Sequence, residues 1–518
     1  MLPSGSSIVL AALLHATQGS LATYTDLPRR SGPLHNLYAR NSTSGLNFAA
    51  GGYNINITLG GSQYAVLIDT GSSDLWVAGA VPQAKATGAS ASIQYAIGSE
   101  AGPVKTAQLE ILGFTVSDQA FIEVPSGGDA PDGTGLIGLG PNTGSRVHDA
   151  LNDQSAGDTP LDRIFRQNLT TPNYLTVLLN RQNDTGEKYT GAMTIGEVLP
   201  QYSNITNQPK VPISALQSSI AQAQHWSVIL DENGIIGPDG KAIKVTSNAT
   251  FAPMHNEDQL VAIFDTGFTL PQVPSEVARA LYSGAKGAKL TNLQSFSGDI
   301  WVIDCDAEVN ATFLIGGQSY PIHPLDLNQQ GADDYGNEIC FGAYQPRIAG
   351  ANDPTLDMIL GMAWLTNVYL LIDYGDFVDG TTKTDKPYVQ ILPMTDPAAA
   401  HADFVAARLS GKDTTGSQHN SGSGSGQDNK DNGGAKGFFE KYKLPIIAGA
   451  AAAGVLLLTA TAFFLFRSRK PAYRPLFEPA PAGSMQMHAV SGYGYNPGVQ
   501  SAPDYHTGAS YADPWNRR

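Results

Sequence analysis

The sequence predicts an all-β fold built from two related halves and followed by one transmembrane helix. Gly (56) and Pro (32) are abundant among the 518 residues, which indicates many turns and argues against a helical bundle. A short Asp-Thr-Gly segment occurs twice, at Asp69 and at Asp265, each time after an apolar run. The stretch 444–466 holds 23 residues without a charge, enough for a helix to cross a bilayer.

The composition limits the classes of partner. The formal net charge is −15, whereas nucleic-acid-binding domains present basic surfaces, so we expect no nucleic acid partner. Hydrophobic residues make up 42% of the chain, which is enough to bury a core.

The N-terminal end has the features of a secretory signal. An apolar run at 8–14 is followed by small residues, which predicts a signal peptide over 1–22, with a buried helix as the alternative. Seven Asn-x-Ser/Thr sequons precede residue 311 and none follows it, which fits a luminal location for this part. The predicted glycosylation sites are Asn41, Asn56, Asn168, Asn183, Asn204, Asn248 and Asn310.

Two connecting segments flank the expected folded part at 46–395. Residues 23–45 form a short propeptide-like segment in which Arg29-Arg30 is a candidate processing site. Residues 406–443 are rich in Gly, Ser, Asn and Asp, which predicts a flexible stalk.

The C-terminal end predicts a single-pass type I membrane protein. Basic residues follow 444–466 directly, which places the tail at 467–518 in the cytoplasm. A GPI signal would end with its apolar run, and here 52 residues follow that run. The tail is rich in Pro, Gly and Tyr and is expected to be disordered. We expect the plasma membrane or cell surface rather than a vacuole-like compartment, with shedding of the ectodomain as an open alternative.

Short apolar or alternating runs predict strands between the two connecting segments. Examples are 53–59, 64–70 and 115–124, which are separated by Gly, Pro, Asn and Asp. The stretch 274–281 begins with Pro and Ser and is amphipathic, which predicts a helix.

The two Asp-Thr-Gly segments carry the candidate chemistry. Each ends an apolar strand and is followed later by an apolar-apolar-Gly element, at 136–138 and at 359–361. The candidate catalytic pair and its supporting turn residues are Asp69, Thr70, Gly71, Ser72, Asp265, Thr266 and Gly267. We expect the glycines to permit tight turns and the threonines to join the two turns to each other.

Paired carboxyl groups can hydrolyse a peptide bond without a covalent intermediate. One must act as a base and the other as an acid at the same pH. Two carboxyl groups about 3 Å apart do so because they share one proton. This chemistry requires no metal and no cofactor.

These motifs resemble the pepsin-like aspartic peptidases, and the chain is similar to a fungal-type, membrane-anchored member. The resemblance implies a bilobal fold over 46–395 with pseudo-twofold related lobes. It also implies an endopeptidase that is active on polypeptides, works at acidic pH and is monomeric. Segments 69–77, 132–140 and 358–375 resemble the family's active-site and psi-loop segments.

The resemblance assigns roles to two aromatic residues and to the cysteines. The segment 93–99 resembles the family's flap, with Tyr95 as its tyrosine and Trp76 as the tryptophan that binds it. Cys305 and Cys340 are the only two cysteines, and an isolated pair in a secreted protein most simply forms one disulfide. The family's disulfide in the C-terminal lobe matches the same pair.

One departure from the family pattern separates the two halves. Phe268 stands where the family usually has Ser or Thr, while Ser72 is present in the first half. Loss of a hydrogen bond to Asp265 predicts that this carboxyl group retains the shared proton. The alternative function is a catalytically silent surface binding or receptor protein, against which the retention of both aspartates argues.

Overall fold

A computed structural model describes residues 43–416. The segments left out within that range are 50–51, 96–97, 128–129, 153–154, 168, 170–171, 182–190, 253–255, 294–295, 297, 348–352, 379 and 381–384. The predicted signal peptide, transmembrane segment and tail, and most of the two connecting segments, lie outside the described residues. Within the described part, no helix is both long and apolar enough to span a bilayer.

The N-terminal half is a β-sheet whose strand order is β2-β3-β8-β4-β7-β6-β5. The runs expected at 53–59, 64–70 and 115–124 become β2, β3 and β7. Side chains of β2 alternate between buried and more exposed positions, as in a sheet with one face on the core. The strands of this half are β1 (Thr43–Ala49), β2 (Gly52–Leu59), β3 (Ser62–Asp69), β4 (Leu75–Ala78), β5 (Lys85–Gln94), β6 (Ser99–Ile111), β7 (Phe114–Val124) and β8 (Thr134–Gly138).

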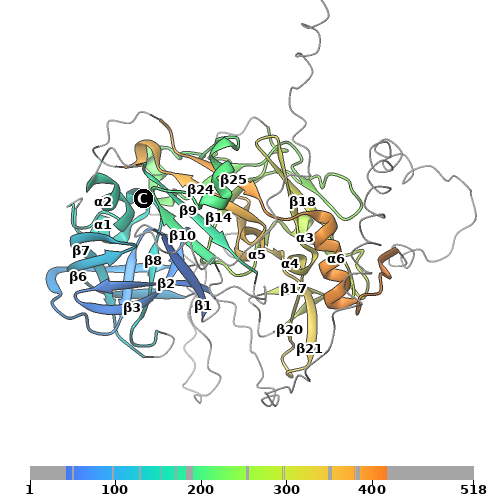
Figure 1. The fold of residues 1–518 in the computed structure, drawn as a ribbon, viewed down its shortest axis with the longest axis horizontal. Coiled ribbons are helices and arrows are strands. Elements are labelled where there is room, and N and C mark those ends of the chain that lie inside the picture. The colour runs from blue at the N-terminus through green and yellow to red at the C-terminus, as the bar shows by residue number, and fades with distance from the viewer. Residues whose placement is uncertain are drawn as a thin grey trace, which may run out of the picture. The chain divides into compact units, whose positions relative to one another are not determined.

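A central sheet joins the two halves of the described unit (Figure 1). Its order is β11-β25-β24-β9-β10-β1, and β24 pairs with β9 so that Tyr369 lies opposite Leu178. The Tyr369 hydroxyl donates to Thr176 Oγ1 at 2.7 Å, which satisfies a buried polar group in this sheet. The strands that it adds are β9 (Tyr174–Leu179), β10 (Gly191–Ile195), β11 (Val211–Pro212), β24 (Val368–Asp373) and β25 (Tyr388–Pro393).

The C-terminal half contains three further sheets, with the orders β12-β14-β23-β15-β22, β13-β18-β19 and β16-β17-β21-β20. Their strands are β12 (Ser227–Ile229), β13 (Ile235–Ile236), β14 (Val261–Phe264), β15 (Gln272–Val273), β16 (Lys289–Asn292), β17 (Asp299–Ile303), β18 (Ala311–Ile315), β19 (Gln318–Ile322), β20 (Asn328–Ala332), β21 (Glu338–Gly342), β22 (Gln345–Pro346) and β23 (Met358–Leu360).

Helices are short and few among the described residues, so the fold is mostly β. The helix expected at 274–281 is α3, which begins after Pro274. The α-helices are α1 (Arg146–Ala150), α2 (Pro160–Gln167), α3 (Ser275–Tyr282), α4 (Pro324–Leu327), α5 (Met362–Leu365) and α6 (Pro397–Arg408). The 3₁₀-helices are η3 (Asn142–Gly144), η4 (Pro200–Asn207), η5 (Ser218–Ala223) and η6 (Gly375–Phe377).

The two halves repeat one strand arrangement. In the first, β3 is parallel to β8, β8 is antiparallel to β4, and β4 is parallel to β7. The second repeats these three pairings in the same sense with β14, β23, β15 and β22. An antiparallel strand flanks each set, β2 beside β3 and β12 beside β14. This repetition gives the pseudo-twofold relation expected from the duplicated motif.

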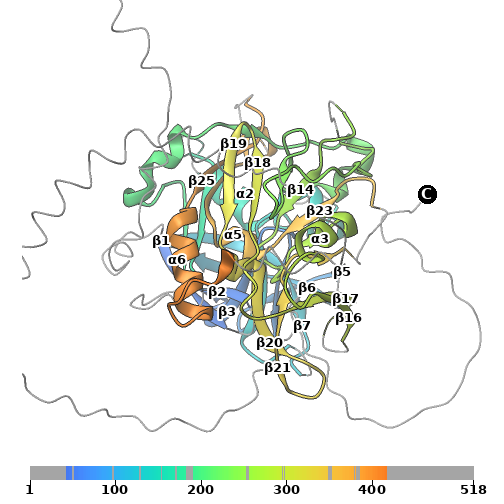
Figure 2. The same cartoon turned by 90° about the vertical axis from the view of Figure 1, so that its right-hand side faces the viewer.

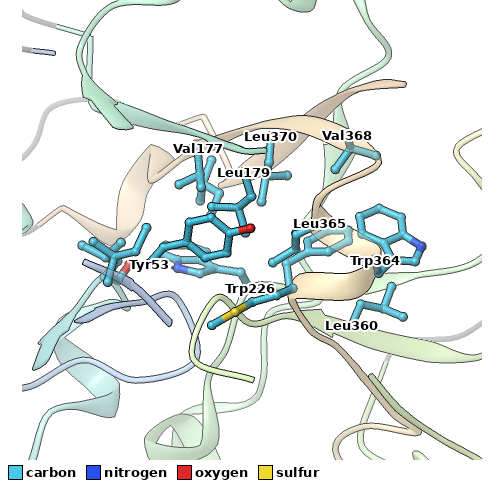
Figure 3. Packing of buried hydrophobic residues seen from close by; sticks show 14 of the residues in the cluster. Tyr53, Val177, Leu179, Trp226, Leu360, Trp364, Leu365, Val368 and Leu370 are labelled. Atoms are coloured by element: carbon cyan, nitrogen blue, oxygen red, sulfur yellow. Dashed lines mark hydrogen bonds between the residues drawn. The ribbon is translucent and has the colours of Figure 1, made fainter. Parts of the chain in front are cut away.

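Aromatic side chains fill the core where the halves meet the central sheet (Figure 3). The rings of Trp226 and Tyr374 lie 4.7 Å apart, and those of Phe264 and Trp364 lie 5.0 Å apart. Such ring pairs contribute roughly 0.5–1.5 kcal/mol each beyond the burial of their area. Phe264 directly precedes Asp265, so this packing fixes the strand that carries the second aspartate.

The folded part extends beyond both predicted boundaries. β1 begins at Thr43, three residues before the expected start at 46. At the other end, α6 continues to Arg408, past the expected end at 395 and into the predicted stalk (Figure 2). Asp396 caps α6 by accepting from the Ala399 N–H at 2.8 Å, and Phe404 is fully buried. An Ala-rich helix next to a Gly- and Ser-rich segment has little amphipathic pattern, which explains why the sequence did not predict it.

Candidate active site

Asp69 and Asp265 end two pseudo-symmetric strands. Asp69 is the last residue of β3 and pairs with Gly138 of β8, while Asp265 directly follows β14. The Asp265 N–H donates to Leu360 O at 3.1 Å. Both aspartates are buried, at 5% and 6% exposure. Because ionisable side chains are rarely buried without partners, we expect each carboxyl group to have hydrogen-bond donors nearby.

Thr70 and Thr266 join the two turns. Each backbone N–H donates to the hydroxyl of the other threonine at 3.0 Å. Each hydroxyl donates onward at 2.7 Å, from Thr70 to Phe264 O and from Thr266 to Ile68 O. The closed set of four hydrogen bonds leaves no donor unsatisfied and fixes the separation of the two aspartates.

The two carboxyl groups have different donors. Asp69 accepts from Gly71 N at 2.8 Å and from Ser72 Oγ at 2.5 Å. Asp265 accepts from Gly267 N at 2.7 Å, and its carboxyl group and that of Asp69 both lie beside Gly267. A side-chain hydroxyl group thus donates to Asp69, because the first half has Ser72 at this position.

Burial, the charge of Asp69 and the hydrogen bond between the carboxyl groups raise the pKa of Asp265 well above its usual range. Hydrogen bonds from the backbone N–H groups of Gly267 and Phe268 oppose this rise. Asp265 therefore carries the shared proton while Asp69 is ionised.

Gly71 and Gly267 are required for a reason different from the expected tight turn. Neither has a positive φ. A Cβ atom on Gly71 would collide with the Asp265 carboxyl group, and one on Gly267 would lie 2.6 Å from Asp69 Oδ1. Each glycine thus leaves room for the opposite aspartate, because real Cβ atoms do not approach other atoms so closely.

Phe268 packs against apolar side chains, whereas a Ser or Thr at this position would offer a hydroxyl group. Its side chain is half-buried against a small apolar cluster that includes Ile263 and Ile359. Its carbonyl accepts from Met362 N at 2.7 Å, which ties the second turn to the start of α5. The departure seen in the sequence is therefore accommodated by the fold.

Tyr95 and Trp76 lie within hydrogen-bonding distance, as the family resemblance implies. Trp76 Nε1 donates to the Tyr95 hydroxyl at 2.8 Å. Tyr95 ends the β5 side of the flap hairpin, and its N–H donates to Gly98 O at 3.1 Å. Gly98 has a φ of +82°, a conformation that favours glycine, whereas Ala96 and Ile97 lie outside the described residues.

Leu139 links the two halves beneath the first turn. It lies in the segment 132–140 that resembles a psi-loop segment, but its own role was not predicted. Its N–H donates to Asp69 O at 2.7 Å. Its carbonyl accepts from Trp226 Nε1 at 2.9 Å and from the Tyr374 hydroxyl at 2.6 Å. These contacts join distant parts of the chain, so the motifs at 132–140 and 358–375 do not by themselves indicate them.

Asp74 anchors the N-terminus of α1 beside the site. Its carboxylate accepts from Ser145 Oγ at 2.6 Å and from the backbone N–H groups of Arg146 and Val147, both at 2.9 Å. Burial raises the pKa of Asp74, and these hydrogen bonds oppose the rise. We interpret Asp74 as a structural residue, because its acceptor atoms are already occupied.

The two predicted site cysteines are joined. Cys305 and Cys340 form a disulfide, with their Cα atoms 5.0 Å apart.

The predicted glycosylation sites are described only in part. Among the sequon asparagines, Asn41, Asn168 and Asn183 lie outside the described residues. The other four, Asn56, Asn204, Asn248 and Asn310, are all exposed. Within the described part, no group of three or more His, Cys, Asp or Glu side chains is arranged to hold a metal ion.

Comparison with known proteins identifies the family. The model for eukaryotic aspartyl proteases matches residues 52–379. Major aspartyl peptidase 1 of Cryptococcus neoformans var. grubii is 26% identical over 343 residues, which cover 62% of this chain and 66% of that protein. An aspartic protease of Phaffia rhodozyma is 26% identical over 355 residues, covering 63% of this chain and 75% of that protein.

A mouse protein and a solved structure are also similar to this chain. Cathepsin E of Mus musculus is 26% identical over 343 residues, covering 60% of this chain and 75% of that protein. The solved aspartic proteinase from Irpex lacteus aligns over 68% of this chain and 98% of its own, with 19% identity and a TM-score of 0.49. Since the family model matches well over half of the sequence, the chain belongs to the eukaryotic aspartyl protease family, the aspartic-type endopeptidases expected from its paired Asp-Thr-Gly segments.

Proposed function

We propose that this chain is a membrane-anchored aspartic endopeptidase in which Asp69 and Asp265 together activate a water molecule. The observation that carries the proposal is the close approach of two buried carboxyl groups, Asp69 and Asp265, whose turns are joined by Thr70 and Thr266. Family membership supports the same reaction.

The unequal donors assign a role to each aspartate. Asp69, with its oxygens accepting from Gly71 and Ser72, acts as the general base that takes a proton from water. Asp265, whose raised pKa keeps it protonated, donates its proton to the carbonyl oxygen of the scissile bond. The resulting tetrahedral intermediate has two hydroxyl groups. Asp69 gives the proton that it took from water to the leaving nitrogen, the C–N bond breaks, and one hydroxyl group returns a proton to Asp265 as the new carboxyl group forms.

The substrate class is polypeptide. Relatives named as aspartyl peptidase and aspartic protease support this class. We propose that an extended peptide binds beneath the flap that carries Tyr95, hydrogen-bonding through its backbone as an added strand would. Because the dyad works only with one proton, we expect hydrolysis at acidic pH.

The proposed location of the chain rests on segments outside the described residues. We propose that residues 1–22 direct it into the secretory pathway and that 444–466 anchor it as a type I protein of the plasma membrane or cell surface. The exposure of Asn56, Asn204 and Asn248 supports glycosylation of this part, since a buried asparagine could not carry a glycan. We further propose that the protein is monomeric.

Hydrolysis of a denatured protein at acidic pH tests the reaction. Asp69→Asn and Asp265→Asn should each abolish cleavage, because neither variant can share a proton between two carboxyl groups. Asp118→Asn is a matched control at an exposed carboxylate, and it should cleave like the parent. Full activity in either dyad variant would exclude the mechanism, and inactivity of the folded parent would favour the receptor alternative.

Membrane anchoring requires a separate test. An antibody against the 467–518 tail should find the protein in the membrane fraction after alkaline washing, and removal of N-glycans should lower its apparent mass. Recovery of the tail-bearing chain in the soluble fraction would contradict anchoring.

A further inference from the structure

Tyr374 lies beneath the first active-site turn. It belongs to the segment 358–375 that resembles a psi-loop segment, but no role of its own was predicted for it. The residue directly follows β24 and is buried, and its hydroxyl donates to Leu139 O at 2.6 Å across 235 positions of the chain. Burial, together with the charge of Asp162, raises the pKa of Tyr374 well above its usual value, so the hydroxyl keeps its proton and acts as the donor.

Trp226 donates to the same carbonyl oxygen and also contacts the second active-site strand. It directly precedes β12, is fully buried (Figure 3) and donates through Nε1 to Leu139 O at 2.9 Å. Its own carbonyl accepts from the N–H of Phe264, the last residue of β14 before Asp265, at 3.4 Å. Because the Leu139 N–H donates to Asp69 O at 2.7 Å, Trp226 connects the strands that carry both aspartates.

Buried neighbours fix the ring and the backbone of Tyr374. The ring lies edge-on to Trp226 and to Phe165 of α2, with ring centroids 4.7 and 5.0 Å apart. The Tyr374 N–H donates to Asn173 O at 3.0 Å, and Asn173 Nδ2 donates to Gly375 O at 2.9 Å. In such a closely packed environment the hydroxyl group has little freedom to move away from its acceptor.

The second half satisfies the corresponding carbonyl by a different means. Leu139 follows Gly138 at the end of β8, and Met362 follows Gly361 after the equivalent strand β23. Met362 begins α5, and its carbonyl accepts from the Thr366 N–H at 2.9 Å at the end of that helix. Leu139 belongs to no helix. The two side-chain donors therefore satisfy this carbonyl on the side of the pseudo-twofold axis where no helix does so.

We propose that Tyr374, together with Trp226, is a positioning residue that holds Asp69 in place for catalysis by way of Leu139. The inference rests on the proposed endopeptidase function, in which Asp69 is the general base. Tyr374, Trp226 and Leu139 are all buried, so none of them can touch a peptide substrate. Their effect must reach the reaction through the backbone of Asp69, and displacement of a catalytic group lowers the rate of the chemical step rather than the affinity for substrate.

Tyr374→Phe tests the proposal in the full-length protein with one peptide that the parent cleaves. The variant keeps the ring but removes one of the two donors to Leu139 O, so kcat should fall about fivefold while KM stays within about twofold. Tyr282→Phe is the matched control. Its buried hydroxyl donates to Leu327 O at 3.1 Å and accepts from the Tyr344 N–H at 3.0 Å, in the C-terminal half.

The control separates positioning from general destabilisation. Tyr282→Phe loses two hydrogen-bond partners, so it should lose at least as much stability as Tyr374→Phe and yet keep kcat within about twofold. A parental kcat in Tyr374→Phe, or an equal fall of kcat in both variants, would overturn the proposal.

Amide hydrogen exchange separates this inference from the proposed function, because it needs no turnover. The Leu139 N–H is bonded to Asp69 O, so a loosened Leu139 should exchange faster. Mass spectrometry of a peptide covering 134–140 should show exchange at least about fivefold faster in Tyr374→Phe than in the parent, and unchanged in Tyr282→Phe. Exchange in Tyr374→Phe that is no faster than in the parent would refute the inference. Full activity in Asp69→Asn would instead exclude the proposed function, whatever the exchange rates are.

Discussion

Thr70 and Thr266 exchange hydrogen bonds across the pseudo-twofold axis, with 3.0 Å from each backbone nitrogen to the opposite hydroxyl oxygen. Both threonines are fully buried, at 1% and 0% exposure, so no water can replace a lost partner. The positions of Asp69 and Asp265 therefore depend on two hydroxyl groups that take no part in the chemistry.

Thr266→Val should destabilise the protein and reduce its activity. The valine methyl group leaves the Thr70 N–H and the Ile68 carbonyl without partners, at a cost of about 2–4 kcal/mol for the two buried groups. Urea unfolding at acidic pH measures the loss, and kcat measures the displacement of Asp265. Thr266→Ser retains the hydroxyl and should stay within about 1 kcal/mol of the parent. Equal stability in the valine and serine variants would contradict a role for these hydrogen bonds.

Phe268→Thr should move the upper limb of the pH–rate profile downward. A hydroxyl at this position would add to Asp265 the donor that Ser72 gives to Asp69, and a donor to the carboxylate lowers its pKa. We expect a shift of about one pH unit, together with a loss of stability because the phenyl ring leaves the apolar cluster around Ile263. Phe268→Leu is the packing control and should not move the limb. A profile in Phe268→Thr that matches the parent would refute the asymmetric dyad.

Tyr95→Phe should weaken substrate turnover without weakening the fold. It removes the hydroxyl that accepts from Trp76 Nε1 at 2.8 Å, one hydrogen bond of about 1 kcal/mol, so kcat/KM should fall roughly fivefold. Tyr64→Phe is a matched control, because its hydroxyl bonds to Ala80 O outside the flap. A larger fall in kcat/KM in the control than in Tyr95→Phe would contradict a role for the flap hydrogen bond in turnover.

The strands and the catalytic pair were predictable because their signals are local. An apolar run that ends in Asp-Thr-Gly predicts both β3 and the position of Asp69 at its end. The duplication of that run in turn predicts a second, related half. The same reasoning failed for Gly71, where the need for glycine comes from the distant Asp265 rather than from the turn itself.

The central sheet and the hydrogen bonds of Leu139 were not predictable, since both join residues that are distant in the sequence. Leu178 and Tyr369 are paired in β9 and β24 but lie 191 positions apart, and no periodicity links them. Likewise, the hydrogen bonds of Leu139 with Trp226 and Tyr374 arise only when the two halves meet.

His323 limits the stability of the protein in acid. Its Nδ1 accepts from the Leu325 N–H at 3.1 Å and caps α4, which requires a neutral ring. Burial and the neighbouring Arg181 lower the pKa of His323 to about 4, while Asp326 and Asp403 oppose the shift. An unfolded chain binds this proton near pH 6.5, so stability is lost as the pH falls from about 6.5 through about 4.

His323→Asn should make the protein less sensitive to acid. Asparagine can cap α4 but does not titrate, so the variant avoids a penalty that reaches about 2–3 kcal/mol below pH 4. At pH 7 the lost packing should leave it about 1–2 kcal/mol less stable than the parent, and by pH 3.5 this deficit should vanish or reverse. Urea unfolding at both pH values gives the comparison.

His401 supplies the opposite slope as an internal control. Hydrogen bonds to Glu308 raise the pKa of His401, so its contribution is present below about pH 6.5 and is lost as the pH rises through the raised value. Because this ring is 39% exposed, the effect of His401→Gln should stay below about 1 kcal/mol and appear only on the acidic side. If His323→Asn and His401→Gln changed stability by the same amount at every pH, neither ring would titrate differently in the folded and unfolded states.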